Sequence, residues 1–331
     1  MEMLNSGSQN EYSCRRRKDG FHIQIGRHSQ SIIDLPAHEI ESIAFKAIEE
    51  HRRNIELGSK RVKKNSPETD VSIISISGLA PLCVKHFKNR GYGYSFKGAF
   101  RATHGARAIH RGKLLFDAGL TSAVPIALVQ KSKWGFVPEE WLVMAAVQDA
   151  IELDRYLVGR VRSKWPDDEK HVFIKLFANF LGKLHECGAF HTDLKTCNIV
   201  VNSANLSGRS PLQNGNHVNP VSFSLIDYDD VRYYRYGVSL KNRAKNFAQL
   251  FLSTPSDINL NDRSQFLKIY LNASDKSEDY GVKLVKATRK RIEGKSLLYV
   301  GPEGDISENW LNERLGDCYH NGLGKSKDEG D

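Results

Sequence analysis

The segment HTDLKTCNIVV, residues 191–201, decides the fold that this sequence predicts. It combines polar side chains at fixed spacing with the start of an apolar strand, and it follows a long apolar segment that ends at Gly188. Downstream, LIDYDD at residues 225–230 places an aspartate at the end of a second apolar strand. A lone HxD triplet is common by chance, whereas HxDLKxxN followed by these two strands is rare. We therefore interpret the segment as a catalytic loop and not as an unrelated turn.

The residue types in this loop suit phosphoryl transfer, which needs a positioned hydroxyl and neutralised phosphate charge. We predict that Asp193 orients the acceptor hydroxyl and accepts its proton, and that Lys195 offsets charge on the transferred group. Asn198 and Asp227 offer the hard oxygen ligands that Mg²⁺ prefers, and a hairpin of the two strands would bring them together. His191 is interpreted as a structural residue that hydrogen-bonds the backbone of the loop.

The composition indicates a folded, basic protein. The chain has 331 residues, of which 40% are hydrophobic, and its 48 Lys and Arg against 39 Asp and Glu give a net charge of +9. This length predicts roughly two domains or lobes. The positive charge favours polyanionic partners such as nucleotide phosphates, an anionic membrane face or nucleic acid. No nucleic-acid-binding motif is present, so we expect no nucleic-acid partner.

The cysteines and the apolar segments indicate the compartment. The five cysteines form neither CxxC pairs nor a Cys/His pattern, which excludes a disulfide scaffold and a zinc site of ordinary spacing. Isolated cysteines favour a reducing compartment. The first 18 residues lack the apolar core of a signal peptide, and no apolar stretch has the length of a spanning helix. We expect a cytoplasmic protein, with a membrane surface as a candidate peripheral site.

Hydrophobic periodicity divides the chain into two halves. In the first half it predicts strands at residues 21–25, 71–76, 82–87, 124–129 and 141–147, and helical patterns at 35–53 and 105–119. In the second half it predicts helices at 150–158, 168–185, 242–252, 265–271 and 282–292, with Asp167 or Asp168 as an N-cap. We predict a flexible basic arm at 1–20, a lobe of strands with one helix at 21–144, a helical catalytic lobe at 145–300 with a polar insert at 202–220, and a polar tail at 301–331.

HTDLKTCN together with LIDYDD resembles the catalytic loop and metal-binding segment of the protein-kinase superfamily. The closer resemblance is to the lipopolysaccharide kinase family, the 3-deoxy-D-manno-octulosonic acid (Kdo) and heptose kinases of Gram-negative bacteria. The metal segment is of the Ile-Asp-Xaa-Asp type and not Asp-Phe-Gly, and KNRAKNFAQL (241–250) and DRSQFLKIYL (262–271) resemble helices of that family. No Ala-Pro-Glu segment follows, which argues against a regulated protein kinase. The resemblance covers roughly residues 55–275.

This resemblance implies an α+β, two-lobed protein-kinase-like fold, with a β-rich N-terminal lobe and a helical C-terminal lobe. It implies ATP and Mg²⁺ as cofactors, with ATP in a cleft near a hinge at Met144–Val147, where Met144 is the predicted contact. Lys85, in the apolar segment LCVK, corresponds to the lysine that contacts the α and β phosphates. The alternative is that Lys85 snorkels to solvent at the edge of a strand. Gly58 and Ser59 stand where a hairpin that covers the phosphates is expected.

One departure from the kinase pattern concerns the helix that follows Lys85. Kinases usually pair this lysine with a glutamate on that helix, but here no Asp or Glu occurs from Val71 to Phe116. Either Lys85 is oriented in another way or activity is impaired. The acid-free stretch holds eight Lys or Arg residues, among them Arg101, Arg107, Arg111 and Lys113. It is interpreted either as a face that binds an anionic acceptor or as a solvated helix face. The basic helix at 283–292 is likewise a candidate membrane surface or an ordinary exposed helix.

The function that these features favour is an ATP-dependent phosphotransferase acting on an alcohol group. The expected acceptor is a sugar hydroxyl, of Kdo or heptose, in the lipopolysaccharide core or in another anionic sugar. A protein or small-molecule kinase of the same superfamily is the alternative enzyme. A pseudokinase that serves as a binding or scaffold module is the alternative from another class, and the missing helix glutamate is its best support.

Overall fold

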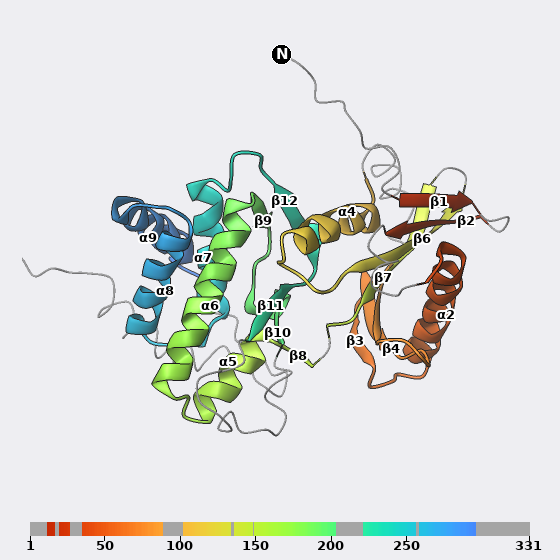
Figure 1. The fold of residues 1–331 in the computed structure, drawn as a ribbon, viewed down its shortest axis with the longest axis horizontal. Coiled ribbons are helices and arrows are strands. Elements are labelled where there is room, and N and C mark those ends of the chain that lie inside the picture. Colours follow the sequence, from red (N-terminus) through yellow and green to blue (C-terminus); the bar gives the residue numbers. More distant parts are fainter. Residues whose placement is uncertain are drawn as a thin grey trace, which may run out of the picture. The chain divides into compact units, whose positions relative to one another are not determined.

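The computed structural model describes residues 12–16, 20–26, 35–88, 102–133, 136–147, 149–202, 221–255 and 258–295. The chain divides into two compact units: the first comprises residues 1–148 together with Asp227–Asp229, and the second comprises the remainder. The first unit is built on a β-sheet and the second mainly from helices, which confirms the predicted α+β class (Figure 1). In the part of the chain that the structure describes, no helix combines the length and apolar character needed to cross a bilayer.

The first unit contains an antiparallel sheet of seven strands in the order β1-β2-β6-β7-β5-β4-β3. Its strands are β1 (Tyr12–Arg16), β2 (Phe21–Gly26), β3 (Val62–Asn65), β4 (Thr69–Ile74), β5 (Leu82–Phe87), β6 (Pro125–Lys133) and β7 (Phe136–Ala145). The β-branched run of β4 pairs with β5 from Thr69↔Phe87 to Ile74↔Leu82. Because β5 lies between β4 and β7, Lys85 occupies a central strand of the sheet.

Strand β1 differs from the prediction of a flexible arm over residues 1–20. Tyr12–Arg16 pair with β2 from Tyr12↔Gly26 to Arg16↔His22. The antiparallel partner satisfies the backbone hydrogen-bonding groups of this polar segment, so it joins the sheet despite its lack of an apolar face. Residues 1–11 and 17–19 of the predicted arm, residues 203–220 of the insert and the tail at 301–331 lie outside the described residues.

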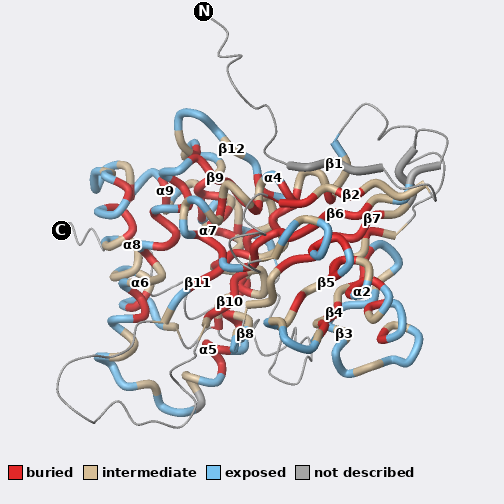
Figure 2. The backbone as a smooth tube through the Cα atoms, turned by 45° about the vertical axis from the view of Figure 1, so that its right-hand side comes forward, coloured by how far each residue is buried: buried red, intermediate tan, exposed pale blue. Residues whose placement is uncertain are grey.

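Two helices accompany the sheet within the described residues, α2 (Ala37–Glu56) and α4 (His104–Asp117). The predicted lobe has only one helix, so this count differs from the prediction. The apolar stripe of α2 packs on apolar side chains of the sheet and forms one core. Figure 2 shows these buried positions along α2 and along strands such as β6 and β7. The core includes Ile40, Ile43, Ala44, Ala47 and Ile48 from the helix, and Ile23, Ile25, Ile74, Val84, Val129, Trp141 and Val143 from the sheet. Each isoleucine or valine among them stabilises the fold by about 1.5–3 kcal/mol when it is fully buried.

Helix α4 approaches its neighbours closely because two glycines leave room. A Cβ atom on Gly105 would lie 2.4 Å from Leu128 Cδ1 and 2.8 Å from Glu140 Oε2. A Cβ atom on Gly112 would lie 2.7 Å from Tyr228 Cε2. The side chain of Thr103 caps the helix by accepting a hydrogen bond from the backbone N–H of Ala106 at 3.2 Å. The glycines therefore let α4 lie against β6 and against the segment Asp227–Asp229.

The second unit contains five helices and two small sheets among its described residues. The helices are α5 (Leu153–Arg162), α6 (Asp167–Glu186), α7 (Leu240–Ser253), α8 (Leu260–Ala273) and α9 (Glu278–Ile292). One sheet has the order β11-β10-β8, and the other pairs β12 with β9. Their strands are β8 (Ala150–Glu152), β9 (Ala189–His191), β10 (Ile199–Asn202), β11 (Ser222–Leu225) and β12 (Val231–Tyr233). Residues 150–152, predicted as the start of a helix, instead pair with β10 as β8.

Helix α6 is the central helix of the second unit, as its apolar character on most faces predicts. Its phenylalanines form an aromatic cluster, in which Phe177 lies 5.1 Å from Phe223 and 5.4 Å from Phe266 between ring centroids. The predicted N-cap is wrong, because Pro166 occupies the cap and Asp167 and Asp168 lie inside the first turn. Carboxylates at that position still stabilise the helix through its dipole.

Candidate active site

The predicted catalytic loop joins β9 to β10 in the second unit, and hydrogen bonds within the loop fix its shape. The backbone N–H of Asp193 donates to Nδ1 of His191 at 3.2 Å, and Nδ2 of Asn198 donates to the carbonyl of Asp193 at 2.7 Å. His191 is fully buried. The predicted structural role of His191 is therefore confirmed, since its ring accepts a hydrogen bond from the loop backbone.

Helix α7 holds the same loop from outside through three polar side chains on one helical face. Asn246 Nδ2 donates to the carbonyl of His191 at 2.6 Å, and Gln249 Nε2 donates to the carbonyl of Thr192 at 2.8 Å. Ser253 Oγ accepts a hydrogen bond from the backbone N–H of Thr196 at 3.0 Å. These three residues are not among the site residues predicted from the sequence. Their spacing over two turns of a helix is the signal that could have found them.

Within this fixed loop, the two side chains predicted to act in catalysis remain accessible. Asp193 Oδ2 and Lys195 Nζ lie 3.1 Å apart, and the two side chains are 45% and 40% exposed. A rigid backbone with exposed functional groups is what a site for an incoming acceptor requires, because positioning supplies much of the catalysis of phosphoryl transfer.

The two strands that flank the motif form the predicted hairpin. β10 and β11 are antiparallel, with Ile199 opposite Leu225, and the backbone N–H of Ile226 donates to the carbonyl of Asn198 at 3.0 Å. Asp227 is the next residue along the chain and has a positive φ of 58°. Such a left-handed conformation is strained for an aspartate and is often found at functional sites.

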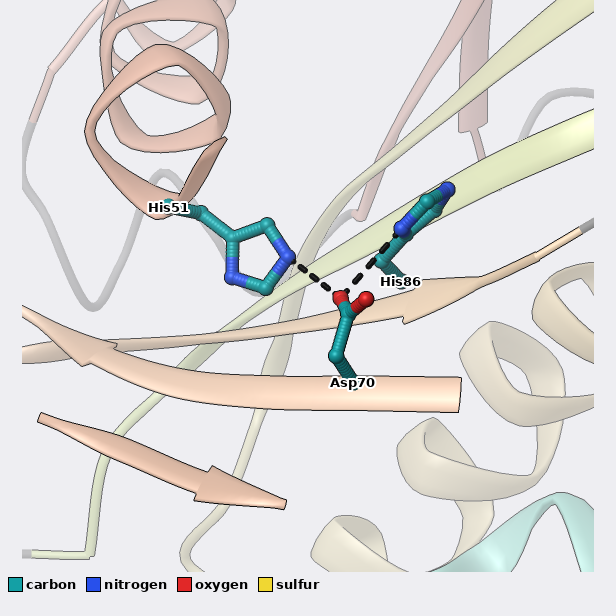
Figure 3. Close-up of side chains that lie close together, drawn as sticks. All are labelled: His51, Asp70 and His86. Atoms are coloured by element: carbon teal, nitrogen blue, oxygen red, sulfur yellow. Dashed lines mark hydrogen bonds and ion pairs between the residues drawn. The ribbon is translucent and has the colours of Figure 1, made fainter. Parts of the chain in front are cut away.

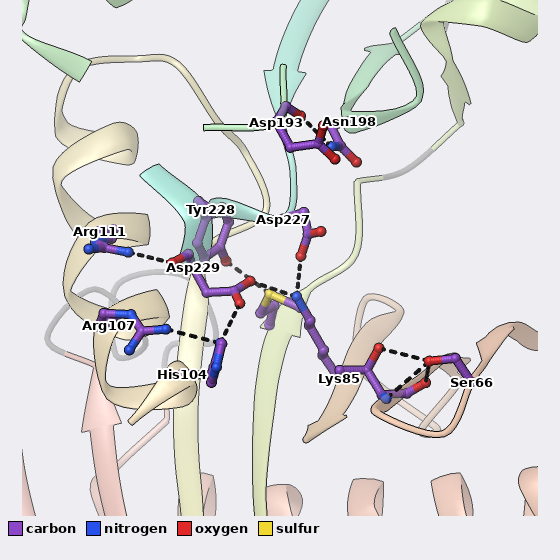
Figure 4. Close-up of polar contacts among 12 residues, drawn as sticks. Ser66, Lys85, His104, Arg107, Arg111, Asp193, Asn198, Asp227, Tyr228 and Asp229 are labelled. Atoms are coloured by element: carbon purple, nitrogen blue, oxygen red, sulfur yellow. Dashed lines mark hydrogen bonds and ion pairs between the residues drawn. The ribbon is translucent and has the colours of Figure 1, made fainter. Parts of the chain in front are cut away.

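In the first unit, Lys85 lies among carboxylates and not in solvent. Its ammonium forms ion pairs with Asp227 and, at 2.6 Å, with Asp229 Oδ1, and its side chain is 10% exposed (Figure 4). The alternative that Lys85 snorkels at a strand edge is wrong, because β5 is central and the ammonium is buried. Burial by itself would lower the pKa of Lys85, but the two carboxylates more than offset this effect and raise that pKa. The pairing with these carboxylates therefore favours the charged form of Lys85.

The two aspartates beside Lys85 differ in their electrostatics. Burial raises the pKa of Asp227, an effect that the charge of Lys85 only partly opposes. Burial also acts to raise the pKa of Asp229, but hydrogen bonding with His104 and the charge of Lys85 hold that pKa below its ordinary value. Asp229 is thus the more firmly ionised partner.

Tyr228, between these aspartates, anchors the segment in the first unit. Its hydroxyl donates to the carbonyl of Ala123 at 2.7 Å and lies 2.9 Å from Sδ of Met144. Met144, predicted to contact ATP at a hinge, lies at the end of β7 and is buried against this tyrosine. Its contact with nucleotide stays a prediction.

The glycine and serine predicted to cover the phosphates lie before the hairpin. β3 and β4 form a hairpin whose turn is Ser66–Glu68, and the backbone N–H of Ser66 donates to the carbonyl of Thr69. Gly58 has a positive φ of 59° and ends α2, and the N–H of Ser59 donates to the carbonyl of Asn54. A left-handed glycine is the usual way to end a helix, which explains the position of this residue. The nucleotide contact of Gly58 and Ser59 stays a prediction.

The basic residues of α4 are engaged locally. Arg107 donates to the carbonyl of Ala102 at 2.8 Å, Lys113 pairs with Asp117 at 2.7 Å, and Arg111 donates to the carbonyl of Asp229. Arg101 lies outside the described residues. The residues predicted to bind an anionic acceptor therefore also make contacts inside the first unit.

A second buried cluster in the first unit consists of His51, Asp70 and His86 (Figure 3). Asp70 Oδ1 lies 2.6 Å from His51 Nε2 and 3.2 Å from His86 Nδ1, and Asp70 Oδ2 lies 2.9 Å from Lys88 Nζ. Three such residue types can bind a metal, but these atoms are at hydrogen-bond distance from one another and an ammonium occupies the second oxygen. We interpret the cluster as a polar anchor that ties α2 to β4 and β5.

The donor chemistry of the predicted metal ligands fits Mg²⁺. Asn198 uses its amide nitrogen toward the loop, which orients its Oδ1 away from that bond, and Asp227 supplies a carboxylate. Both are hard oxygen donors of the kind that Mg²⁺ prefers. When bound, the ion would neutralise charge on the phosphates of ATP.

Known proteins resemble this chain in sequence and in structure. The family model for the lipopolysaccharide kinase (Kdo/WaaP) family matches residues 83–270, more than half of the chain. A solved structure of WaaP in complex with acyl carrier protein has a TM-score of 0.50 and 18% identity, and the match covers 72% of this chain and 90% of that one.

The Mycobacterium tuberculosis PknI kinase domain is also similar, with a TM-score of 0.37, 13% identity, and coverage of 69% of this chain and 94% of that one. A search of curated proteins gave no match. The family match confirms the predicted family, and the likeness to WaaP confirms the predicted fold. The chain belongs to the lipopolysaccharide kinase (Kdo/WaaP) family and is an ATP-dependent phosphotransferase that acts on a sugar hydroxyl.

Proposed function

We propose that this kinase phosphorylates a hydroxyl of Kdo or heptose in the lipopolysaccharide core, with Mg²⁺-ATP as phosphoryl donor. The observation that carries the proposal is the catalytic loop, in which Asp193 and Lys195 stay accessible while α7 fixes their backbone. A carboxylate and an ammonium at 3.1 Å provide one group that can accept a hydroxyl proton and one that can offset phosphate charge.

Each residue in the proposal has one role. Asp193 orients the acceptor hydroxyl and accepts its proton, and Lys195 stabilises charge on the transferred phosphoryl group. Lys85 holds the phosphates of ATP, and Asn198 and Asp227 hold Mg²⁺. These roles need no covalent intermediate, because phosphoryl transfer is catalysed mainly by position and charge.

The acceptor is anionic, which suits the net charge of +9. Kdo carries a carboxylate, and the lipid to which the core sugars are attached carries phosphates. We propose that the enzyme acts at the cytoplasmic face of the inner membrane, where such an acceptor would be presented. Basic residues on α9, among them Lys283, Lys286 and Lys290, are candidates for contact with that surface.

The test is transfer of radiolabel from γ-labelled ATP to two purified acceptors, one ending in Kdo and one that also carries heptose. Label on only one of them identifies the sugar, and label on neither contradicts the proposal. Asp193→Ala is expected to lower turnover on the order of 10²-fold or more, while ATP still binds. Asp168→Ala is the matched control, because Asp168 is an exposed aspartate in the first turn of α6. Near-normal turnover of Asp193→Ala would exclude its role as base.

A further inference from the structure

The contacts around Lys85 show which carboxylate pairs with it in the absence of a glutamate on α4. In the first unit, Asp229 Oδ1 lies 2.6 Å from Lys85 Nζ, although the two residues are 144 positions apart in the chain. Asp227 also contacts Lys85, but that carboxylate is the proposed metal ligand. Mg²⁺ bound to Asp227 would share the negative charge of that carboxylate and weaken its pairing with the buried ammonium. Asp229 supplies a second anion beside Lys85.

Asp229 is held so that its carboxylate faces Lys85. Its side chain is 8% exposed, and its second oxygen, Oδ2, lies 3.1 Å from Nδ1 of His104 on α4. Arg111, about two turns further along the helix, donates to the backbone carbonyl of Asp229. With one oxygen bound by the helix and the other bound by the lysine, the carboxylate has no freedom to rotate away.

The partner of Asp229 on α4 is itself held in place. The ring of His104 stacks on Phe87, with 5.7 Å between ring centroids, and its Nδ1 points toward the carboxylate of Asp229 (Figure 4). Phe87 also lies on β5, two residues beyond Lys85 and on the same face of the strand, with Lys85 Nζ 4.9 Å from its ring centroid. Helix, strand and acidic segment thus meet around one carboxylate.

We infer that Asp229 is a positioning residue that holds Lys85 toward the phosphates of ATP, with α4 contributing the donors His104 and Arg111 in place of an acid. In most kinases the helix carries the carboxylate that pairs with the lysine. Here α4 instead binds the carboxylate of Asp229, and that carboxylate pairs with Lys85. This arrangement removes the main support for a pseudokinase, because the lysine is paired without a helix glutamate. The inference rests on the proposed role of Lys85 in nucleotide binding.

The decisive variant is Asp229→Asn, which keeps the shape of the side chain and removes its charge. We expect its KM for ATP to rise and its kcat to fall, with kcat/KM for ATP lower by about 10- to 100-fold, because a lysine displaced by about 1 Å loses its alignment. KM for the sugar acceptor and the Mg²⁺ concentration for half-maximal activity should stay at their wild-type values. Asp230→Asn is the matched control, since Asp230 is the adjacent aspartate and is exposed.

Two further variants keep the test valid if Asp229→Asn folds poorly. Asp229→Glu restores the charge and should recover part of the ATP affinity, and His104→Gln should lower kcat/KM for ATP by about 3- to 10-fold while leaving acceptor KM unchanged. An Asp229→Asn enzyme within twofold of wild type would overturn the inference. The inference would also be wrong if Asp229→Asn changed the Mg²⁺ concentration for half-maximal activity but left the KM for ATP unchanged. Asp229 would then act as a metal ligand.

Failure of the inference can be told apart from failure of the proposed function. Binding of ATP and ADP to the purified full chain, measured by calorimetry, reports on Lys85 without any acceptor. If wild-type protein binds ATP but labels no sugar, the proposed acceptor is wrong and the Asp229 comparison still stands. If Asp229→Asn binds ATP as wild type does while wild type labels lipopolysaccharide, the inference is wrong and the function stands.

Discussion

Asp70 and Asp229 are both buried aspartates of the first unit, and lysine and histidine surround each of them. Asp70 contacts His51, His86 and Lys88, and Asp229 contacts Lys85 and His104. The residue types match, but the surroundings differ. The partners of Asp70 lie within 19 positions of it along the chain, whereas those of Asp229 lie 125 and 144 positions away.

The difference between the two networks lies in what the lysine can do. The network of Asp70 joins α2, β4 and β5, and Lys88 at its end also hydrogen-bonds the carbonyl of Ser66 and Asn65 Oδ1. Every partner in the network of Asp70 therefore belongs to the packed structure of the first unit. The network of Asp229 ends at Lys85, beside an aspartate in a strained backbone conformation. The same chemistry can therefore serve stability in one place and nucleotide binding in another.

The largest expected effect concerns stability at Asp70. Asp70→Ala leaves two histidines and a lysine without their shared acceptor, and removal of one partner from a buried ionic cluster costs about 3–5 kcal/mol. Urea unfolding of wild type and variant measures the loss. Asp117→Ala, which breaks an exposed pair with Lys113, is the control and should cost under about 1 kcal/mol. A loss below about 1 kcal/mol for Asp70→Ala would contradict the anchor role.

The second prediction exchanges the two lysines for an uncharged side chain of similar length. Lys85→Met should lower kcat/KM for ATP on the order of 10²-fold, because a preorganised cation at the phosphates is lost. Lys88→Met should leave kcat/KM unchanged and lower the free energy of unfolding by about 1 kcal/mol, since Lys88 is partly exposed. Steady-state kinetics and urea unfolding on both variants provide the measurement. If both lysines affect activity equally, the two networks do not differ in function.

The third prediction concerns pH. Burial of Asp70 acts to raise its pKa, but hydrogen bonds with His51, His86 and Lys88 lower the pKa below its ordinary value of 3.8. Below that pH the unfolded chain binds a proton that the native protein does not, so the stability from Asp70 is present above about pH 4 and is lost as the pH falls. The slope is at most about 1.4 kcal/mol per pH unit.

The pH effect is measured as the difference in free energy of unfolding between wild type and Asp70→Asn. This difference should be constant between pH 5 and pH 4.5 and should shrink on further acidification. A difference that grows toward low pH would mean that the native pKa of Asp70 is raised and would contradict the hydrogen-bonding pattern.

The smallest effect expected is that of transition metals on the His51, Asp70 and His86 cluster. Because these groups already bond one another and Lys88, Zn²⁺ would have to displace an ammonium to bind there. Dialysis against a chelator, or addition of an equimolar amount of Zn²⁺, should shift the melting temperature by less than about 1 °C. If the protein contained stoichiometric zinc and His86→Ala abolished it, the cluster would be a metal site and not a structural anchor. Asp70 and Asp229 would then not differ in the way proposed.

Local features of this fold could be predicted because their cause lies in nearby residues. The alternation of β5, the spacing in α2 and the loop HTDLKTCN each depend on neighbours within about one element. The position of Gly58 shows the limit of such reasoning. A glycine before a basic strand fits a phosphate-covering turn, and the structure shows that the left-handed backbone of Gly58 also ends α2, so its position does not by itself identify a nucleotide contact.

The amino-acid order alone was sufficient for the family, the class of fold, the hairpin of β10 and β11 that follows the HTDLKTCN loop, and the structural role of His191. Each of these is written in one or two short, contiguous motifs. The partner of Lys85, the hold of α7 on the loop, and the enclosure of Asp70 were decided by packing, because they join residues from 16 to 144 positions apart. No periodicity or spacing specifies which of several distant carboxylates meets a buried lysine; that depends on how close glycines let α4 approach the segment that carries Asp229.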